Sequence, residues 1–369
     1  MSLQEQQEDQ VIMKYQKITK LMFKIKKRLI SEKKTPFIIA EMSGNHNGSL
    51  ATALKIVDLA AEAGADAIKL QTYTPETITM RSSRKEFFIK DKKNMWKNNS
   101  LFDLYKKAQT PWAWHKIIFE RAKKKKLIYF SSPFDETAVD FLENLNVPLY
   151  KIASFESNHF PLLKKVAKTG KPVIMSTGLA TLPEIKESVE YLRKNGCKQL
   201  ALLKCTSSYP ANPEDLNLIS IQKLKKIFNC EVGFSDHSLG IGAALTAINN
   251  GASIIEKHFT IAKNKGVDGF FSSEVTEMKR LREESTVAWK ARGRVFFGPT
   301  KNELRYKKFR RSIYISQNIK KGDYFSKDNL KVIRPGFGIH PKFYESLMGK
   351  IVKKNGKKGQ PLKKVFFDY

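Results

Sequence analysis

Residues 231–259 read EVGFSDHSLGIGAALTAINNGASIIEKHF, two short apolar runs separated by one helix-length stretch. Each run is typical of a buried strand, and each ends on a histidine, His237 and His258. Parallel strands joined by a single helix have their carboxyl ends at the same end of the sheet. The stretch therefore predicts one repeat of a parallel barrel with both imidazoles at the same mouth, where a divalent metal would bind.

The alternation of apolar strands and amphipathic helices continues from Pro36 onward, about eight times in all. Eight such repeats build a closed (β/α)8 TIM barrel. The predicted strands are residues 37–42, 67–71, 127–131, 149–153, 172–176, 200–204, 231–235 and 253–257. The predicted helices include residues 51–63, 111–124, 136–144, 182–194 and 242–249. A doubly wound open sheet is the alternative fold, but the first strand is followed by Glu41-Met-Ser-Gly-Asn-His rather than by a GxGxxG turn.

The chain divides into four segments. Residues 36–291 form the predicted barrel, and residues 292–308, with Gly293, Gly298 and Pro299, break its pattern as a linker. Residues 309–369 are short, strand-like and turn-rich, which predicts a small β-rich module. Residues 1–35 precede the first strand as an N-terminal extension, a helix or a disordered arm, to which no function is assigned.

Composition places the chain among soluble proteins of a reducing compartment. Its 369 residues are 41% hydrophobic, enough for one large barrel and a small extra domain. The three cysteines, Cys197, Cys205 and Cys230, lack CxxC spacing and lie in or beside apolar runs, so we expect thiols and a cytoplasmic location. No apolar stretch approaches the roughly 18 to 20 residues of a membrane span, and no signal peptide opens the chain. No membrane partner is expected.

Basic residues outnumber acidic ones, 67 to 36, for a net charge of +31. Such an excess can indicate a nucleic-acid or membrane-surface partner. The basic residues are instead spread along the whole chain, as at 123–126, at 164–165 and after Lys350. We therefore expect a lysine-rich surface that attracts anionic substrates, and no nucleic-acid partner.

Polar side chains gather at the ends of the predicted strands, where a barrel places its active face. Lys69 and Lys151 lie within apolar strands, and a buried ammonium needs an anionic ligand or a carboxylate partner. Phosphate is the preferred interpretation, and an internal salt bridge is the alternative. Hydroxyls that could complete a phosphate cradle are those of Ser132, Ser154, Ser176 and Ser235. Glu41 ends the first strand, where it could act as a general base or cap a neighbouring helix.

The two histidines form the candidate metal site. A lone histidine in an apolar run is usually a core residue, but two at equivalent strand ends favour metal binding. Imidazole and oxygen ligands with open positions suit Mn²⁺ or Mg²⁺, and Zn²⁺ or Fe²⁺ are alternatives.

Several motifs together resemble the sialic acid synthase (NeuB-like) family, enzymes that condense phosphoenolpyruvate with a sugar aldehyde. In chain order they are FIIAEMSGNHNGS, GADAIKLQTYTP, FSSPFD, YKIASFE, MSTGLAT, LKCTSSYP, GFSDHS and EKHFT. The tail stretch RSIYISQNIKKGDYFSKDNLKVIRPGFG is similar to the family's small antifreeze-like (SAF) domain. Phe155 within YKIASFE and the stretch GFGIHPKFYESLMGK resemble the pseudaminic acid synthase branch.

The resemblance implies roles for individual residues. His237 and His258 would bind the metal, and Glu41 would handle the proton of a water or hydroxyl. The implied phosphoenolpyruvate pocket consists of Lys69, Ser132, Lys151, Ser154, Ser176, Ser207 and Ser235. The implied contacts to the amino sugar are Gln71, Glu156, Tyr209, Asp268 and Arg334. Arg334 would be offered by the tail domain across the interface of a domain-swapped homodimer.

The implied reaction joins phosphoenolpyruvate to 2,4-diacetamido-2,4,6-trideoxy-altrose to give pseudaminic acid and phosphate. One alternative keeps this chemistry but makes N-acetylneuraminate or legionaminate. Another is a non-catalytic carbohydrate- or RNA-binding protein that uses the basic surface.

Overall fold

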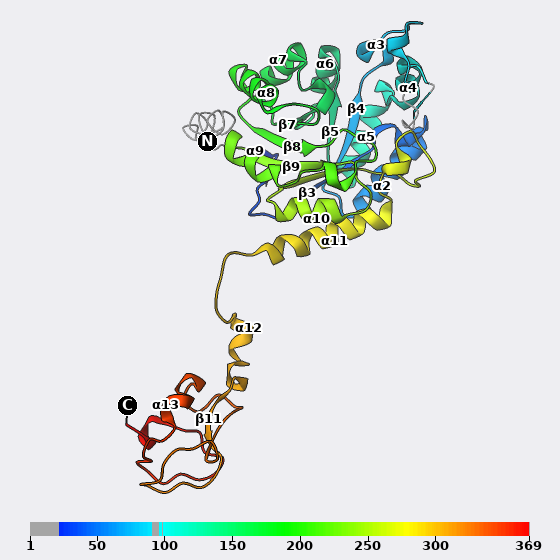
Figure 1. Cartoon of the computed structure of the whole chain (residues 1–369). Coiled ribbons are helices and arrows are strands. Elements are labelled where there is room, and N and C mark those ends of the chain that lie inside the picture. The colour runs from blue at the N-terminus through cyan, green and yellow to red at the C-terminus, as the bar shows by residue number, and fades with distance from the viewer. Residues whose placement is uncertain (1–21, 91–95, 98, 369) are drawn as a thin grey trace. The chain divides into compact units, whose positions relative to one another are not determined.

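The computed structural model describes residues 22–90, 96–97 and 99–368. Eight parallel strands form a closed barrel in the order β3 to β10, with β10 pairing back to β3 (Figure 1). They are β3 Phe37–Glu41, β4 Ala67–Thr72, β5 Ile128–Pro133, β6 Tyr150–Ile152, β7 Val173–Ser176, β8 Leu200–Cys205, β9 Glu231–Asp236 and β10 Ile254–His258. All eight predicted strands are confirmed to within two residues at each end. Because the sheet closes, the alternative of an open, doubly wound sheet is excluded.

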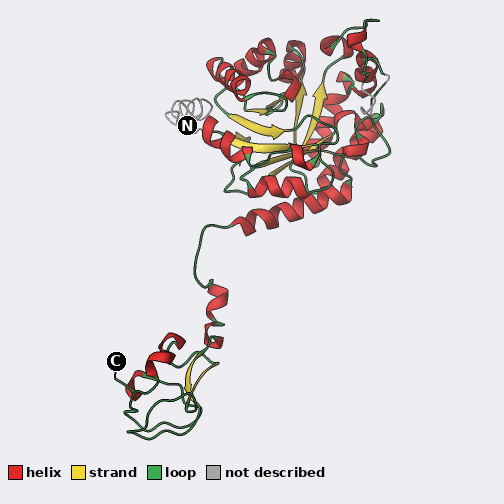
Figure 2. Cartoon of the chain, viewed as in Figure 1, coloured by secondary structure: helices red, strands yellow, loops and turns green. Residues whose placement is uncertain are grey.

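Helices cover the outside of the barrel (Figure 2). They are α2 Leu50–Glu62, α5 Trp112–Lys124, α6 Glu136–Asn144, α7 Phe160–Lys168, α8 Leu182–Lys194, α9 Ser220–Phe228, α10 Gly242–Asn249 and α11 Val275–Arg292. The five predicted helices are confirmed, and α8 illustrates why. A capping box between Thr181 and Glu184 starts it, and Ile185, Val189 and Leu192 form its buried stripe.

Shorter elements occupy the connections. Between β4 and α5 lie α3 Pro75–Ile78, η2 Lys85–Phe87 and α4 Leu101–Ala108. The 3-10 turns that follow barrel strands are η1 Ser43–His46, η3 Ser154–Glu156, η4 Pro213–Asp215 and η5 Gly269–Phe271. Within the described residues, no helix combines the length and the apolar character needed to cross a membrane.

Apolar side chains fill the barrel toward the amino ends of its strands. Each of them lies two residues before the polar residue near the carboxyl end of the same strand. The inward-facing residues are Ile39, Ala67, Phe130, Leu149, Ile174, Leu203 and Ile254, all fully buried. Phe23, Ile25 and Ile30 join this cluster from a short hairpin of β1 Lys24–Ile25 and β2 Arg28–Leu29. The predicted barrel boundary at residue 36 is therefore too late, because this hairpin shares the barrel's core. Residues 1–21 of the predicted extension lie outside the described residues.

Asp66 ties the hairpin to the barrel wall. Its carboxylate forms ion pairs with Arg28 of β2 and Arg282 of α11, and it accepts a hydrogen bond of 2.8 Å from the backbone N–H of Ile38. A partly buried carboxylate between two guanidinium groups satisfies most of its acceptor positions. This single residue therefore joins three elements that are distant in sequence.

The first compact unit ends at Gly293, and the second begins at Arg294. The second unit contains the antiparallel pair β11 Ser312–Ile315 and β12 Leu330–Ile333, with the short helices α12 Lys301–Leu304 and α13 Tyr344–Leu347. Its remaining 3-10 turns are η6 Lys307–Phe309, η7 Pro341–Phe343 and η8 Lys364–Phe366. It has its own core, as expected for the predicted small module.

Gly233, in β9, is a position where a larger residue has no room. A Cβ atom there would lie 2.7 Å from Leu203 Cδ2 and closer still to the carbonyl oxygen of Ile254. We expect Gly233→Ala to lower the free energy of unfolding by about 1–3 kcal/mol. Urea unfolding followed by circular dichroism measures this. Gly242→Ala is the control, because no atom lies within 4 Å of its Cβ position. Equal stability of the two variants would contradict this packing.

Candidate active site

One polar side chain from each of the eight strands forms a closed layer above the apolar core. We call it the polar ring: Glu41, Lys69, Ser132, Lys151, Ser176, Cys205, Ser235 and Glu256. All eight are buried. Side chains two residues apart on a strand share a face, so seven ring members stand above an apolar residue of the core, and Ser235 stands above Gly233. The predicted clustering of polar residues at the strand ends is thus an inward-facing ring.

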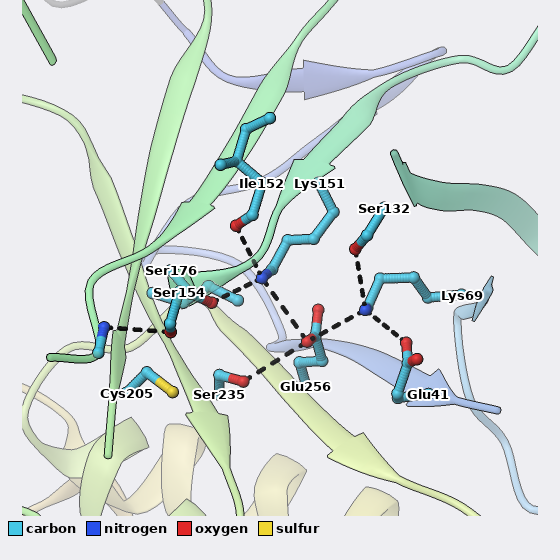
Figure 3. Close-up of polar contacts among 12 residues, drawn as sticks. Glu41, Lys69, Ser132, Lys151, Ile152, Ser154, Ser176, Cys205, Ser235 and Glu256 are labelled. Atoms are coloured by element: carbon cyan, nitrogen blue, oxygen red, sulfur yellow. Dashed lines mark hydrogen bonds and ion pairs between the residues drawn. The ribbon is translucent and has the colours of Figure 1, made fainter. Parts of the chain in front are cut away.

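Two lysines and two carboxylates of the polar ring form one chain of ion pairs in the order Lys151, Glu256, Lys69, Glu41 (Figure 3). Lys69 Nζ lies 2.5 Å from Glu41 Oε2 and 3.6 Å from Glu256 Oε1. Lys151 Nζ lies 3.8 Å from the same oxygen of Glu256. One carboxylate therefore serves both ammonium groups, and the internal salt bridge, the alternative to a bound phosphate, is present.

Serine hydroxyls of the ring accept hydrogen bonds from the two lysines. Lys69 Nζ donates to Ser132 Oγ at 3.2 Å, and Lys151 Nζ donates to Ser176 Oγ at 2.6 Å. Each ammonium thus combines an ion pair with a hydroxyl acceptor, which reduces the cost of burying its charge.

Burial and neighbouring charges shift the pKa values in the ring. Burial raises the pKa of Glu41 from 4.5 to about 7, although Lys69 partly offsets it. Burial acts in the same direction on Glu256, but Lys151 and Lys69 outweigh it and lower the pKa of that carboxyl group. Burial lowers the pKa of Lys151. For Lys69, burial is outweighed by Glu256 and Glu41, which raise its pKa. Near neutral pH, Glu41 is thus partly protonated beside two lysines, and the ring favours an additional anion.

Above the ring lies a cavity of about 520 Å³. The predicted site residues that line it are Lys69, Gln71, Lys151, Ser154, Glu156, Ser176, Ser207, Tyr209, Ser235, His237, His258 and Asp268. Glu41 and Ser132 do not line it, and both contact the lysine that does, Lys69. Arg334 belongs to the second compact unit, not to the unit that contains this cavity.

The two predicted histidines lie side by side at the cavity. Their ring centroids are 5.4 Å apart. Nδ1 of His237 lies 3.0 Å from the carbonyl oxygen of Thr206, to which it can only donate, so Nε2 has a lone pair in the neutral imidazole. Burial lowers the pKa of His237, but Cys205 and the Thr206 carbonyl outweigh it and raise the pKa above 6.5. Nδ1 of His258 is buried without a hydrogen-bond partner, and the nearest carboxylate oxygen, of Asp268, is 3.7 Å away. Burial and the proximity of His237 hold the pKa of His258 well below 6.5, so this imidazole is neutral.

Ser154 and Ser207 are brought together by a close approach of the backbone at Gly178. A Cβ atom on Gly178 would lie 2.7 Å from Ser154 Oγ and even closer to Ser207 Oγ. The backbone N–H of Gly178 donates to Ser154 Oγ at 3.2 Å. A larger residue at position 178 would have to displace these hydroxyls.

Two ring members were absent from the predicted site. Glu256 precedes His258 by two residues, so the two-residue period of a strand places both side chains on the same face. This spacing could have identified Glu256 as a site residue from the sequence. Lys257 points the other way, where its Nζ lies 2.8 Å from Asp236 Oδ2. Cys205 is a free buried thiol, as predicted, and its Sγ lies 3.9 Å from His237 Nδ1.

Each of the two parts of the chain matches a known protein family or domain. Residues 56–296 match the NeuB family, and residues 310–367 match the SAF domain. The chain is 45% identical to the pseudaminic acid synthase of Campylobacter jejuni, over 89% of this chain and 96% of that protein. It is 40% identical to the pseudaminic acid synthase of Helicobacter pylori, again over 89% and 96%.

A solved structure supports the fold. The N-acetylneuraminic acid synthetase of Leptospira borgpetersenii, in complex with citrate, aligns with a TM-score of 0.68 at 34% identity. The alignment covers 78% of this chain and 95% of that one.

Glu156 should make stability depend on pH. Burial raises its pKa from 4.5 to about 7, partly offset by Lys151, so in this window the folded protein retains a proton that the unfolded chain releases. Stability therefore falls as the pH rises through the window. We expect the stability of Glu156→Gln relative to wild type to rise by roughly 2 kcal/mol from pH 5 to pH 8.

Chemical denaturation at several pH values measures this difference. Glu120→Gln, at an exposed position on α5, is the control and should differ from wild type by a constant amount. A pH-independent difference for Glu156→Gln as well would contradict the effect of burial.

Proposed function

Since the chain belongs to the NeuB family, we propose that it condenses phosphoenolpyruvate with an open-chain amino sugar. The proposed sugar is 2,4-diacetamido-2,4,6-trideoxy-altrose, and the products are pseudaminic acid and phosphate. The observation that carries the proposal is the pair of buried lysines on the cavity floor, in a chain 45% identical to a pseudaminic acid synthase. A buried cationic floor suits a small ligand with phosphate and carboxylate groups.

The lysines hold phosphoenolpyruvate in this proposal. Lys69 and Lys151 neutralise its phosphate and carboxylate, and the hydroxyls of Ser154, Ser176 and Ser207 donate to its oxygens. Each lysine already shares its charge with Glu256, which keeps its position before the ligand arrives. This arrangement supports binding with little reorganisation of the protein.

His237 and His258 are the proposed ligands of a divalent metal, Mn²⁺ or Mg²⁺. The unpartnered Nδ1 of His258 and the free lone pair of His237 fit a cation that accepts neutral imidazoles. Among the described residues, no three His, Cys, Asp or Glu side chains group together as a metal site, so water and substrate would supply the remaining ligands. When bound, such an ion polarises the aldehyde oxygen of the sugar as a Lewis acid.

The protein's own residues direct the remaining steps. The enol carbon of phosphoenolpyruvate attacks the aldehyde carbon, and positive charge develops on the carbon that bears the phosphate. Water adds there, and the resulting tetrahedral intermediate expels phosphate. Lys69, which lies between Glu41 and the cavity, passes one of its ammonium protons to Glu41 and takes up the proton of this water, so that Glu41 ends protonated and Lys69 stays an ammonium. The pKa of Glu41, about 7, suits proton exchange near neutral pH.

Gln71, Glu156, Tyr209 and Asp268 are the proposed contacts to the sugar. Homodimer formation, with Arg334 offered to a partner chain, remains part of the proposal, as does a cytoplasmic location. None of the three described cysteines forms a disulfide, which fits a reducing compartment. Light scattering of the purified protein measures the number of subunits.

Phosphate release tests the function. We expect release from phosphoenolpyruvate with Mn²⁺ only when a suitable sugar is present, and fastest with the diacetamido-trideoxy sugar. Faster release with N-acetylmannosamine or the legionaminate precursor would instead assign one of those syntheses. Glu41→Gln should lower kcat by roughly 100-fold while the KM of phosphoenolpyruvate changes little. Turnover at the wild-type rate would refute the role of Glu41.

Calorimetric titration tests the metal site without turnover. We expect Mn²⁺ to bind one site per chain, and His237→Ala and His258→Ala each to weaken binding at least about 10-fold. His159→Ala, at the start of α7 and outside the cavity, should bind as wild type does. Unchanged affinity in both substituted cavity histidines would exclude this site.

A further inference from the structure

The cavity has two chemically different halves. Its floor is the polar ring, whereas much of one wall comes from the long connection between β4 and α5 and is apolar. Helix α4, Leu101–Ala108, is the main regular element of that wall.

One stripe of α4 faces the cavity. Leu101, Leu104, Tyr105 and Ala108 all line it, and their spacing places them on one face of a helix. Phe102 is the buried residue of α4 and points elsewhere. Asp103, Lys106 and Lys107 are exposed. The apolar stripe is therefore directed at the cavity, and its members stay partly exposed.

Contacts at both ends fix the position of α4. A Cβ atom on Gly44 would lie only 3.1 Å from Ala108, so the end of α4 packs directly on η1. Tyr105 packs edge-on against Tyr73, with ring centroids 5.8 Å apart. At the start of the helix, the guanidinium of Arg81 lies 4.3 Å from the ring centroid of Phe102. The stripe is thus a preformed surface.

Phe155 adds a second apolar surface to the same cavity. Its side chain is 60% exposed, although its neighbours Ser154 and Glu156 are both buried. A large aromatic side chain left open at a cavity whose floor is charged indicates a ligand with one apolar side.

We propose that the α4 stripe, together with Phe155, recognises the methyl groups of the sugar, those of its acetamido substituents and of its deoxygenated end. This inference rests on the proposed function and names the feature of the sugar that the site selects. The aliphatic members of the stripe, Leu101, Leu104 and Ala108, offer no side-chain hydrogen-bond partner, so a hydroxyl placed against them loses its bond to water without replacement. A methyl group in the same place gains from burial.

Leu104→Asn tests the stripe, because it keeps the approximate size of the side chain and makes it polar. We compare kcat/KM for the diacetamido-trideoxy sugar and for N-acetylmannosamine, whose corresponding end carries hydroxyls. We expect the ratio between them to fall by roughly 10-fold in favour of the hydroxylated sugar. The KM of phosphoenolpyruvate should stay unchanged. Leu104→Met should keep the wild-type ratio, and Lys107→Ala, on the exposed face of α4, is the matched control.

Calorimetric binding of each sugar, without phosphoenolpyruvate, separates this inference from the proposed function. If wild-type protein releases no phosphate with any sugar, the proposed function fails, but the affinity ratio of the two sugars still tests the stripe. A ratio that is equal in wild type and Leu104→Asn, by turnover or by affinity, overturns the inference. Thermal unfolding of each variant shows whether it still folds. If Leu104→Asn does not fold, the milder Leu104→Thr replaces it in both measurements.

Discussion

The sharing of Glu256 between Lys69 and Lys151 is the interaction on which the site depends. Isolated ammonium groups inside a barrel would be too costly to remain charged, and each would lose its proton or the fold would lose stability. A carboxylate between them keeps both charged and in place. Because distances of 3.6 and 3.8 Å are longer than those of tight ion pairs, this carboxylate holds the lysines without saturating them. Charge stays available for a ligand on the open side.

The geometry of a parallel barrel explains why these charges meet. Each strand contributes one inward side chain at the level of the ring, and seven of the eight contribute an apolar side chain two residues earlier; β9 has Gly233 there. The charged layer therefore rests on a dry core that the β1–β2 hairpin closes from its other end. The charged groups are buried, so their interactions are stronger than they would be at the surface. The same strands thus supply an apolar layer that stabilises the barrel and, next to it, a charged layer that lines the cavity.

The sequence alone predicts those parts of the molecule that follow from period and spacing. Eight strand patterns give the barrel, and the histidines of residues 231–259 are placed together because one helix separates their strands. The role of Glu256 depends on the lysines of β4 and β6, far away in sequence, and no local pattern contains them. Helix α4 has only eight residues, and its apolar stripe faces a cavity rather than the core. The hairpin before β3 was missed because its burial depends on filling the barrel end, a tertiary effect.

Ligand and carboxylates compete for the same ammonium groups, which links binding to protonation. An anion beside Lys69 and Lys151 adds negative charge next to Glu41 and Glu256, and like charges raise the pKa of a carboxyl group. Glu41, whose pKa already lies at about 7, then becomes a stronger base for the proton that the proposed reaction takes from water. Loss of that anion reverses the change and makes the same carboxyl group a better acid. Two buried carboxyl groups with divergent pKa values beside two lysines thus link anion binding to protonation, which suits the proposed reaction, in which water adds and phosphate leaves.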